Sequence, residues 1–302
     1  MRRLLAANLL VIERTTAPNA KRRTAKTMKI LAINSDMHVN SAVGLLPPNA
    51  RLDSGQEVKQ SKSQAWMWER WLGFWRDAEK AASALKSDIV SVINGDWGDI
   101  IRLRNGAQLI EHENKNVVMQ FMKDATKPMR DVTDDIIVNR GTEAHTGGAG
   151  WLEEKVSSEI EARKDPLTGL SSFWVLRLQV EGVRFLIAHH PMTNGRVKWT
   201  LGSAANRAAA SVALDYYNEE QKPDAAIFGH VHHSEDSFDN QPVRAIYTPP
   251  WCLANSYTHR LGAGLAPVEK VGGLIIVVDG NSCRVFKRYF DTPREEEQWL
   301  KI

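Results

Sequence analysis

The sequence predicts an α/β protein in which helices cover a parallel or mixed β-sheet. Short hydrophobic runs alternate with longer segments of helical periodicity through the first half of the chain. The second half is richer in strand-like runs, and the runs 172–180 and 183–188 are separated by Glu181-Gly182, as in a hairpin. Several of the runs end directly in Asp, His or Glu. Ligands bind at the carboxyl ends of strands in such sheets, so we expect the functional site there.

The individual elements follow from the length and period of the apolar runs. Short continuous runs predict buried strands, whereas apolar residues that recur every three or four positions predict helices. The predicted strands are 29–33, 89–93, 135–140, 172–180, 183–188, 225–228, 243–247, 273–279 and 284–289. The predicted helices are about 63–85, about 110–126, a segment from the glycine-rich turn 147–150 to about 163, and the alanine-rich segment 203–218. Residues 40–62 are polar and proline-containing, and they predict a long loop.

Composition and charge limit the classes of protein that remain. The chain has 302 residues, of which 43% are hydrophobic and 25% charged, which is ordinary for a globular protein. Residues 1–27 contribute +6 to a net charge of only +3, so residues 28–302 carry −3. The basic balance therefore belongs to the first segment and does not indicate a general polyanion-binding body. No run approaches the roughly 18 apolar residues of a membrane span, so we expect no membrane partner.

We expect two parts in the chain, a basic, disordered leader at 1–27 and one domain at 28–302. The leader faintly resembles a signal peptide, but its apolar part is short and no Ala-x-Ala site follows. An upstream start codon, with the natural start at Met28, is the alternative. Cys252 and Cys283 are too few for a disulfide framework, which favours reduced thiols and a cytoplasmic location.

Metal-ligand side chains follow four of the predicted strands. Taken singly, each motif has a structural alternative, such as a turn or a buried, hydrogen-bonded histidine. Together they supply two carboxylates and at least four imidazoles, which can hold two divalent cations with one carboxylate between them. Two such ions lower the pKa of a bridging water and clamp a phosphate, so a hydroxide can attack in line. The motifs are Asp36-x-His38, Gly95-Asp96, His189-His190 and Gly229-His230-Val231-His232.

These motifs, in this order, resemble the calcineurin-like metallophosphoesterase superfamily over about residues 28–260. The resemblance implies a four-layer α/β/β/α sandwich, in which two mixed β-sheets face each other and helices flank them. It also implies a metal-dependent phosphoric ester hydrolase with two divalent cations. The implied roles are Asp36, His38 and His232 for the first metal, Asp96 as the bridge, and His189 and His230 for the second metal, with His189 preferred over His190.

The third motif departs from that family. Gly141–His145 stands where Gly-Asn-His-Asp/Glu is expected, so Thr142 replaces an asparagine ligand and a neutral hydroxyl is a poor substitute. We predict that Glu143 supplies the missing metal ligand and that His145 is the general acid. The alternative is that Glu143 caps the next helix and His145 only orients a neighbouring group. Arg140 is predicted to reach a phosphate oxygen during catalysis, or else to pair with an acid at the surface.

Three further features have weaker signals. Asp99 is expected to orient a ligand histidine, and Trp97 to line the pocket. Trp68, Trp71 and Trp75 recur at helical spacing, which is more typical of a core-facing helix than of a platform for stacked bases. The long loop before these tryptophans and the altered third motif resemble superfamily members from phage and prophage genomes.

These features lead to one main functional prediction and one alternative. The main prediction is a phosphodiesterase or nuclease acting on a nucleotide or single-stranded nucleic acid, with a phosphomonoesterase as the second possibility. The acidic body disfavours tight binding of a duplex. Manganese is the first expectation for the two metals, and iron, zinc and nickel also suit mixed nitrogen and oxygen ligands. The alternative is a non-catalytic metal-binding scaffold with a degenerate third motif. The sequence does not determine the oligomeric state.

Overall fold

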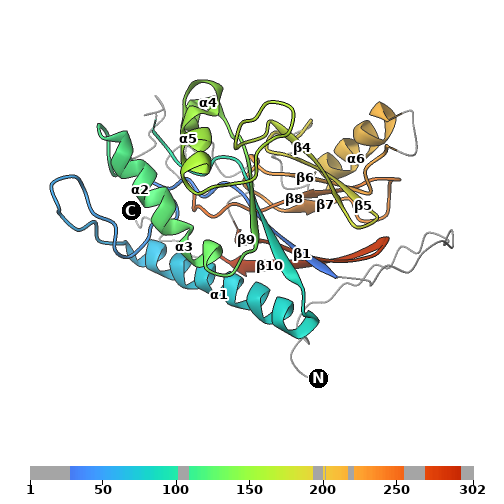
Figure 1. Cartoon of the computed structure of the whole chain (residues 1–302), viewed down its shortest axis with the longest axis horizontal. Helices are drawn as coiled ribbons and strands as arrows, with labels where there is room; N and C mark the ends of the chain where they lie inside the picture. Colours follow the sequence, from blue (N-terminus) through green and yellow to red (C-terminus); the bar gives the residue numbers. More distant parts are fainter. Residues whose placement is uncertain are drawn as a thin grey trace, which may run out of the picture.

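The computed structural model describes residues 28–100, 109–192, 200, 202–216, 221–254 and 269–293. The predicted leader, residues 1–27, lies outside these residues. The described chain forms two five-stranded mixed sheets flanked by helices, as predicted (Figure 1). None of the described helices combines the length and the apolar character that crossing a membrane requires.

The first sheet has the strand order β10-β9-β1-β2-β3. Its parallel part consists of β1 (Lys29–Asn34), β2 (Asp88–Asn94) and β3 (Asp135–Asn139), which are nearly continuous apolar runs. An antiparallel hairpin of β9 (Lys270–Asp279) and β10 (Ser282–Asp291) continues the sheet beyond β1. Because β1, β2 and β3 run in the same direction, the loops that follow them leave from one edge.

The second sheet has the order β4-β5-β6-β8-β7. The predicted hairpin is present as β4 (Val175–Val180) and β5 (Val183–Ala188). β5 is parallel to β6 (Ala225–Phe228), and β6 is parallel to β8 (Arg244–Tyr247). The short edge strand β7 (Glu235–Asp236) was not predicted, because two charged residues carry no hydrophobic period.

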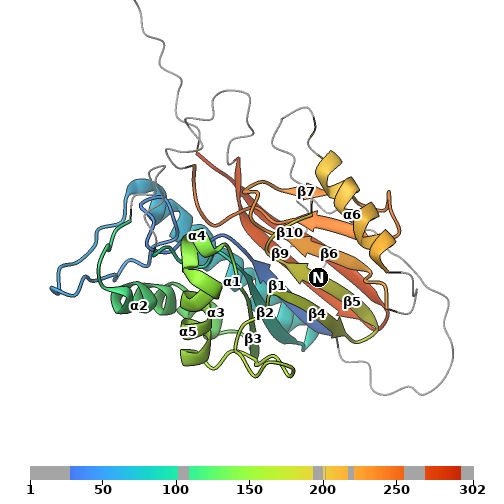
Figure 2. The ribbon, with the colours of Figure 1, turned by 90° about the horizontal axis from the view of Figure 1, so that it is seen from above.

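Helices cover the outer face of each sheet. On the first sheet lie α1 (Lys62–Leu85), α2 (Lys115–Ala125), α3 (Lys127–Arg130) and α5 (Trp151–Glu159), and on the second lies α6 (Ser203–Asp215). The two groups are on opposite sides of the paired sheets in the two views (Figures 1 and 2). The short helix α4 (Glu143–Thr146) and the 3-10 turn η1 (Gly148–Gly150) link β3 to α5.

Three separate hydrophobic clusters correspond to the three contacts between four layers. One joins α1, α2 and α5 to the first sheet, one lies between the sheets, and one joins α6 to the second sheet. Side chains of β1 alternate between two of them, since Ile30 packs toward the helices and Leu31 toward the second sheet. The structure is therefore the α/β/β/α sandwich that the sequence resemblance implied.

Helix α1 packs through its tryptophans. Its start is fixed by a capping box in which Ser61 and Gln64 exchange hydrogen bonds with each other's backbone N–H groups. Trp71 and Trp75 are almost completely buried, and the Trp71 indole donates to the Ala125 carbonyl at 2.9 Å. These two side chains belong to the core, as the core-facing alternative predicted, and are not available to stack with bases.

Candidate metal centre

The candidate centre lies where the carboxyl ends of β1, β2, β3, β5 and β6 meet. Backbone hydrogen bonds tie the loops together, with Asp36 N donating to Gly95 O and Gly229 N donating to His189 O, both at 3.0 Å. The Asn94 side chain joins the two sheets by donating to Ala188 O at 3.0 Å. Strands that are distant in sequence thus deliver their terminal side chains to one place.

Two buried carboxylates occupy the middle of the cluster. Asp36 and Asp96 are 0% and 1% exposed. His189 Nε2 is 3.0 Å from Asp96 Oδ2 and 3.9 Å from Asp36 Oδ1. On the other side of Asp36, His232 Nε2 is 3.2 Å from Oδ1 and 3.0 Å from His38 Nε2. The predicted ligands Asp36, His38, Asp96, His189 and His232 are therefore brought together.

Asp99 binds two imidazoles at once. Its Oδ1 is 3.0 Å from His38 Nδ1 and 2.8 Å from His145 Nδ1. The far nitrogen of His145, Nε2, is 4.0 Å from Asp96 Oδ2, and the side chain is 18% exposed. This geometry leaves one nitrogen of His145 directed at the carboxylate cluster and close to solvent, which is the placement that a proton donor needs.

Thr142 occupies the centre of the remaining imidazoles. Its hydroxyl is 3.2 Å from Asp96 Oδ2, His190 Nε2 and His230 Nδ1, and 3.5 Å from His189 Nε2. Its backbone N–H also donates to Asp96 Oδ1 at 2.5 Å. His230 is thus part of the cluster as predicted, and His190, which the sequence analysis ranked below His189, is part of it too.

The structure places Glu143 outside the cluster, in disagreement with its predicted role. Its side chain is exposed and accepts a hydrogen bond from Ala149 N at 2.8 Å. Among the described residues, the groups of potential ligands do not include Glu143. The carboxylate instead ties the start of α4 to η1, and it caps neither η1 nor α5, since the N-termini of both have no side-chain cap hydrogen bond.

The Arg140 side chain is likewise bonded to groups outside the cluster. Its guanidinium donates to Ser172 Oγ at 2.8 Å and Ala149 O at 2.7 Å, pairs with Glu154 at 3.3 Å, and lies over the Trp174 ring. The prediction that Arg140 reaches a phosphate oxygen therefore disagrees with the structure. Local sequence contains no sign of these partners, because all of them except Ala149 come from segments that follow a helix or a long loop.

In the cluster, the carboxylates and the imidazoles offset each other's energetic cost of burial. Burial works against ionised Asp36, but His189 and His232 outweigh it and hold the pKa of that carboxyl below its usual range. Burial likewise opposes ionised Asp96, and His189 and His145 hold its pKa well below normal. In the opposite sense, Asp96 and Asp36 outweigh the burial of His189 and raise its pKa to about 9. Positive charge is therefore stabilised between the two carboxylates.

The backbone at the centre is strained. Five of the predicted ligands adopt the left-handed conformation, which costs an L-residue about 1–2 kcal/mol. They are Asp36 (φ 54°), His38 (φ 44°), Asp96 (φ 49°), His230 (φ 70°) and His232 (φ 58°). Glycine would relieve that strain, yet five residues able to bind a metal stand in these positions.

Two glycines allow the loops to approach this closely. A Cβ at Gly141 would lie 2.1 Å from Asp96 N, and one at Gly229 would lie 2.0 Å from Ser35 Oγ. Neither contact leaves room for a side chain. The glycines that open the third and last motifs are therefore required by packing at the centre.

The donors fit divalent cations. Several trios of ligand atoms lie within 4.8 Å of one another, and they share members, so the whole forms one continuous cluster. The trios are Asp36–Asp96–His189, His38–Asp96–His145, His189–His190–His230 and His38–His232–Cys252. Imidazoles surround the two buried carboxylates, and among the described contacts neither carboxylate has a lysine or arginine partner. Such a set of side chains is typical of sites for zinc, iron, manganese or nickel.

Two residues that shape the centre were not predicted from the sequence. Cys252 Sγ lies 3.6 Å from His232 Nδ1, and burial raises the pKa of this thiol to about 12. Glu153, completely buried in α5, accepts hydrogen bonds from Trp97 N at 3.1 Å and Gly141 N at 2.6 Å. Neither residue stands in a recognisable motif. The one sequence signal for Glu153 is that a glutamate occupies the apolar face of a predicted helix.

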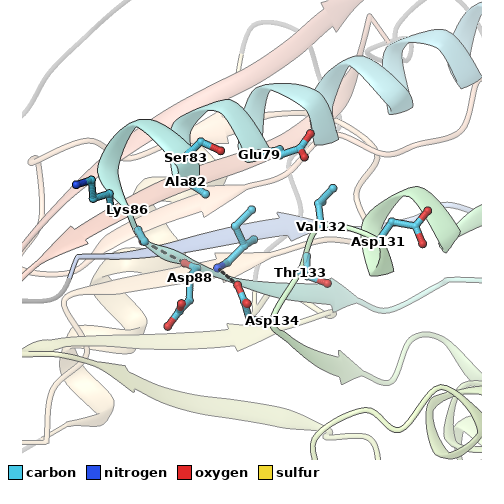
Figure 3. Close-up of a pocket in the computed structure, with 11 residues that line it drawn as sticks. Glu79, Ala82, Ser83, Lys86, Asp88, Asp131, Val132, Thr133 and Asp134 are labelled. Carbon is cyan, nitrogen blue, oxygen red and sulfur yellow. Dashed lines mark hydrogen bonds between the residues drawn. The ribbon is translucent and has the colours of Figure 1, made fainter.

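A different hollow of about 470 Å³ lies at the opposite end of β2 (Figure 3). It is lined by the end of α1 and by the segment before β3, including Glu79, Lys86 and Asp131. Its lining contains no histidine or cysteine. It is shallow and polar, and it offers none of the chemistry found at the carboxyl ends of the strands.

Comparisons with known proteins give structural matches alone. No family model matches the sequence, and neither does any curated protein. Similar solved structures include a Vps29 protein from Entamoeba histolytica, with 12% identity, 85% of this chain and 98% of that chain covered, and a TM-score of 0.34. A dimetal phosphatase from Danio rerio has 8% identity, coverage of 88% and 99%, and a TM-score of 0.38. A 5′-nucleotidase precursor from Thermus thermophilus has 11% identity, coverage of 88% and 54%, and a TM-score of 0.39. At these identities and TM-scores, the matches establish neither a family nor an activity for this chain.

Proposed function

We propose that this chain is a dinuclear metal-dependent phosphoesterase of the calcineurin-like type. The observation that carries the proposal is the pair of buried carboxylates, Asp36 and Asp96, both within 3.9 Å of His189 Nε2 and surrounded by imidazoles. In this assignment Asp36, His38 and His232 would hold the first ion, His189 and His230 would hold the second, and Asp96 would be shared by both. When bound, the ions would supply hydroxide at neutral pH and neutralise charge on phosphate oxygens.

The protein's own contribution to the reaction is orientation and a proton. Asp99 holds Nδ1 of His145, so His145 is fixed with Nε2 toward the carboxylates. We assign to this nitrogen the proton that the leaving oxygen takes up. His189 donates Nδ1–H to the Asn94 carbonyl at 2.7 Å, which turns Nε2, the nitrogen that would bind the metal, toward Asp96.

The proposed substrate is a phosphodiester in a nucleotide or a single-stranded nucleic acid, with a phosphomonoester as the second choice. The net charge of −3 for residues 28–302 supports a small or flexible substrate over a duplex. Manganese, a phage-type placement and a cytoplasmic location are likewise proposals that the sequence supports. The described cysteines are free, which agrees with a reducing compartment.

A non-catalytic metal-binding scaffold is the competing proposal. Its specific support is Thr142, which presents a neutral hydroxyl where the resembled family has an asparagine ligand. Substitution of His145 distinguishes the two proposals, because a non-catalytic scaffold does not need a proton donor.

The test is hydrolysis of bis(p-nitrophenyl) phosphate and p-nitrophenyl phosphate with manganese, zinc, iron or nickel added. We expect Asp96→Asn to abolish turnover. His145→Ala should lower kcat by about 10²–10⁴-fold on an alkyl ester, and by less on nitrophenyl esters, whose leaving groups need little protonation. His112→Ala, which removes an exposed imidazole that belongs to none of the groups of potential ligands, is the control. Inactivity with all four metals bound would contradict the enzymatic proposal, and full activity of His145→Ala on an alkyl ester would contradict the assignment of the proton donor.

A further inference from the structure

The cluster around Thr142 contains three imidazoles where the family resemblance accounts for two. His189 and His190 follow β5, and His230 follows β6. Their ring centroids are 4.7 to 5.3 Å apart, and one ligand atom from each lies within 4.8 Å of the other two. Adjacent residues in a strand point to opposite faces, but β5 has ended at Ala188, so both histidines can turn the same way.

The Thr142 hydroxyl marks the point on which the three rings converge. It contacts His190 Nε2, His230 Nδ1 and His189 Nε2 at 3.2, 3.2 and 3.5 Å, and Asp96 Oδ2 at 3.2 Å. Three ring nitrogens and one carboxylate oxygen thus surround a single polar atom. Three imidazoles and a carboxylate are the donor set of a four-ligand cation site, which an ion would occupy once the Thr142 hydroxyl turns away.

Other residues of the third motif do not complete this set. Glu143 is exposed and bonded to Ala149 N, and Thr142 offers only a neutral hydroxyl. Asn139 precedes this motif at the end of β3 and is fully buried; its amide nitrogen donates to Asn94 Oδ1 and Ile187 O, both at 2.9 Å, and its Oδ1 has no hydrogen-bond partner. His190 is exposed, so its ring can approach an ion without disturbing the core.

We propose that three imidazoles, His189, His190 and His230, hold the second ion together with the bridging Asp96. His190 supplies the ligand that the altered third motif lacks. This inference rests on the metal binding within the proposed function, and not on hydrolysis. Imidazole suits zinc, iron and nickel, whereas oxygen-rich sites suit manganese, so the second site should select zinc over manganese.

The experiment titrates metal-free protein with Zn²⁺ by calorimetry and counts bound zinc after gel filtration by mass spectrometry. We expect two equivalents for the wild type, for Glu143→Ala and for the His112→Ala control. His190→Ala should keep one equivalent and bind the second at least about 100-fold more weakly. Loss of a residue that only orients a ligand weakens metal binding by up to about 100-fold, so a larger effect indicates a direct ligand. Free imidazole should restore the second equivalent, since it can replace a ligand.

Each outcome bears on the proposal. The proposal is overturned if His190→Ala binds two equivalents as tightly as the wild type. It is also overturned if Glu143→Ala loses the second equivalent. A wild type that binds fewer than two zinc ions also overturns it. Thermal unfolding of each variant establishes that it is folded. If the wild type binds two ions and hydrolyses no ester, the proposed function fails while the ligand assignment stands.

Discussion

His38 and His230 are both proposed metal ligands, yet they have opposite electrostatic surroundings. Burial disfavours the charged form of His38, but Asp99 outweighs burial and raises its pKa to about 9. Burial also disfavours charged His230, and there the positive field of His189 adds to it, so its pKa falls to about 4. At neutral pH, metal-free protein thus carries a proton on His38 and none on His230.

We therefore predict that metal affinity increases with pH. A protonated imidazole has no free lone pair, so an ion must displace the protons of His38 and His189, whose pKa values are both about 9. Below pH 9, each displaced proton should change the affinity by about tenfold per pH unit, with tighter binding at higher pH. Calorimetric titrations between pH 6.5 and 8.5, in buffers of different ionisation enthalpy, give both the affinity and the number of protons released.

Asp99→Asn provides the matched variant for this prediction. The substitution removes the charge that holds the proton on His38, so fewer protons should be released and the pH dependence should be shallower. Affinity that is constant from pH 6.5 to 8.5 in the wild type would contradict the assignment of both histidines.

At the scale of the element, helix α5 acts on the centre through one side chain. Glu153 accepts hydrogen bonds from Trp97 N in the loop after β2 and from Gly141 N in the loop after β3. It therefore fixes the spacing between Asp96 and Thr142. The arrangement has a cost, because burial and the neighbouring Asp96 charge raise the pKa of Glu153 to about 7.

We predict that Glu153→Ala destabilises the protein more than Glu153→Gln. Alanine leaves two buried N–H groups without an acceptor, at about 1–3 kcal/mol each, whereas glutamine keeps one acceptor and removes a buried charge. Urea denaturation of metal-free protein measures the free energy of unfolding. Glu159→Gln, in a solvent-exposed pair with Lys123, is the control and should change it by no more than about 0.5 kcal/mol. An alanine variant as stable as the wild type would refute this role of α5.

The pH dependence of the Glu153 contribution has a definite sign. Its pKa in the folded protein, about 7, exceeds the ordinary value of 4.5, so the folded state holds a proton that the unfolded state releases between these values. The stabilisation from that proton is fully present below about pH 4.5 and is lost as the pH rises through 7. Glu153→Gln should therefore destabilise the metal-free protein less at pH 7.5 than at pH 5.5.

On the scale of the whole molecule, the centre joins the two sheets. Asp36 and Asp96 come from the first sheet, and His189, His230 and His232 from the second. A bound ion would therefore cross-link the two halves of the sandwich at the edge where their loops meet. We predict that chelation lowers the melting temperature and that added zinc or manganese restores it.

The size of this effect follows from linkage. An ion at 100 times its dissociation constant stabilises the folded state by about 2.7 kcal/mol. For chains of 150–250 residues each kcal/mol corresponds to about 2–4 °C, so a shift of several degrees is expected here. Differential scanning fluorimetry with and without EDTA measures it, and Asp96→Asn should lose the response to metal. Equal melting temperatures in EDTA and in excess metal would argue against bound ions that link the sheets.

Much of the architecture was predictable from local sequence. Nine predicted strands correspond to observed strands because most are apolar runs, while β4 and β10 mix apolar with polar residues; among the described strands, only β7 carried no such signal. Boundaries were less accurate at polar ends: the predicted helix 110–126 is observed as α2 over Lys115–Ala125, with the separate helix α3 after it, and the helix after Gly150 ends at Glu159, short of 163. Their ends depend on capping and on tertiary contacts, which the hydrophobic period does not encode.

The sequence by itself determined the alternation of strands and helices and the ligand types at the strand ends, because both are written in short, contiguous motifs. Only the tertiary structure decided which polar side chains of the altered third motif and its neighbours reach the centre. Glu143 and Arg140 stand beside it in sequence but bond to Ala149, Ser172 and Glu154, whereas His190 turns toward Thr142. The physical reason is competition among partners: a charged side chain goes to the nearest complementary group in space, and only the folded chain decides which groups, near or distant in sequence, lie there.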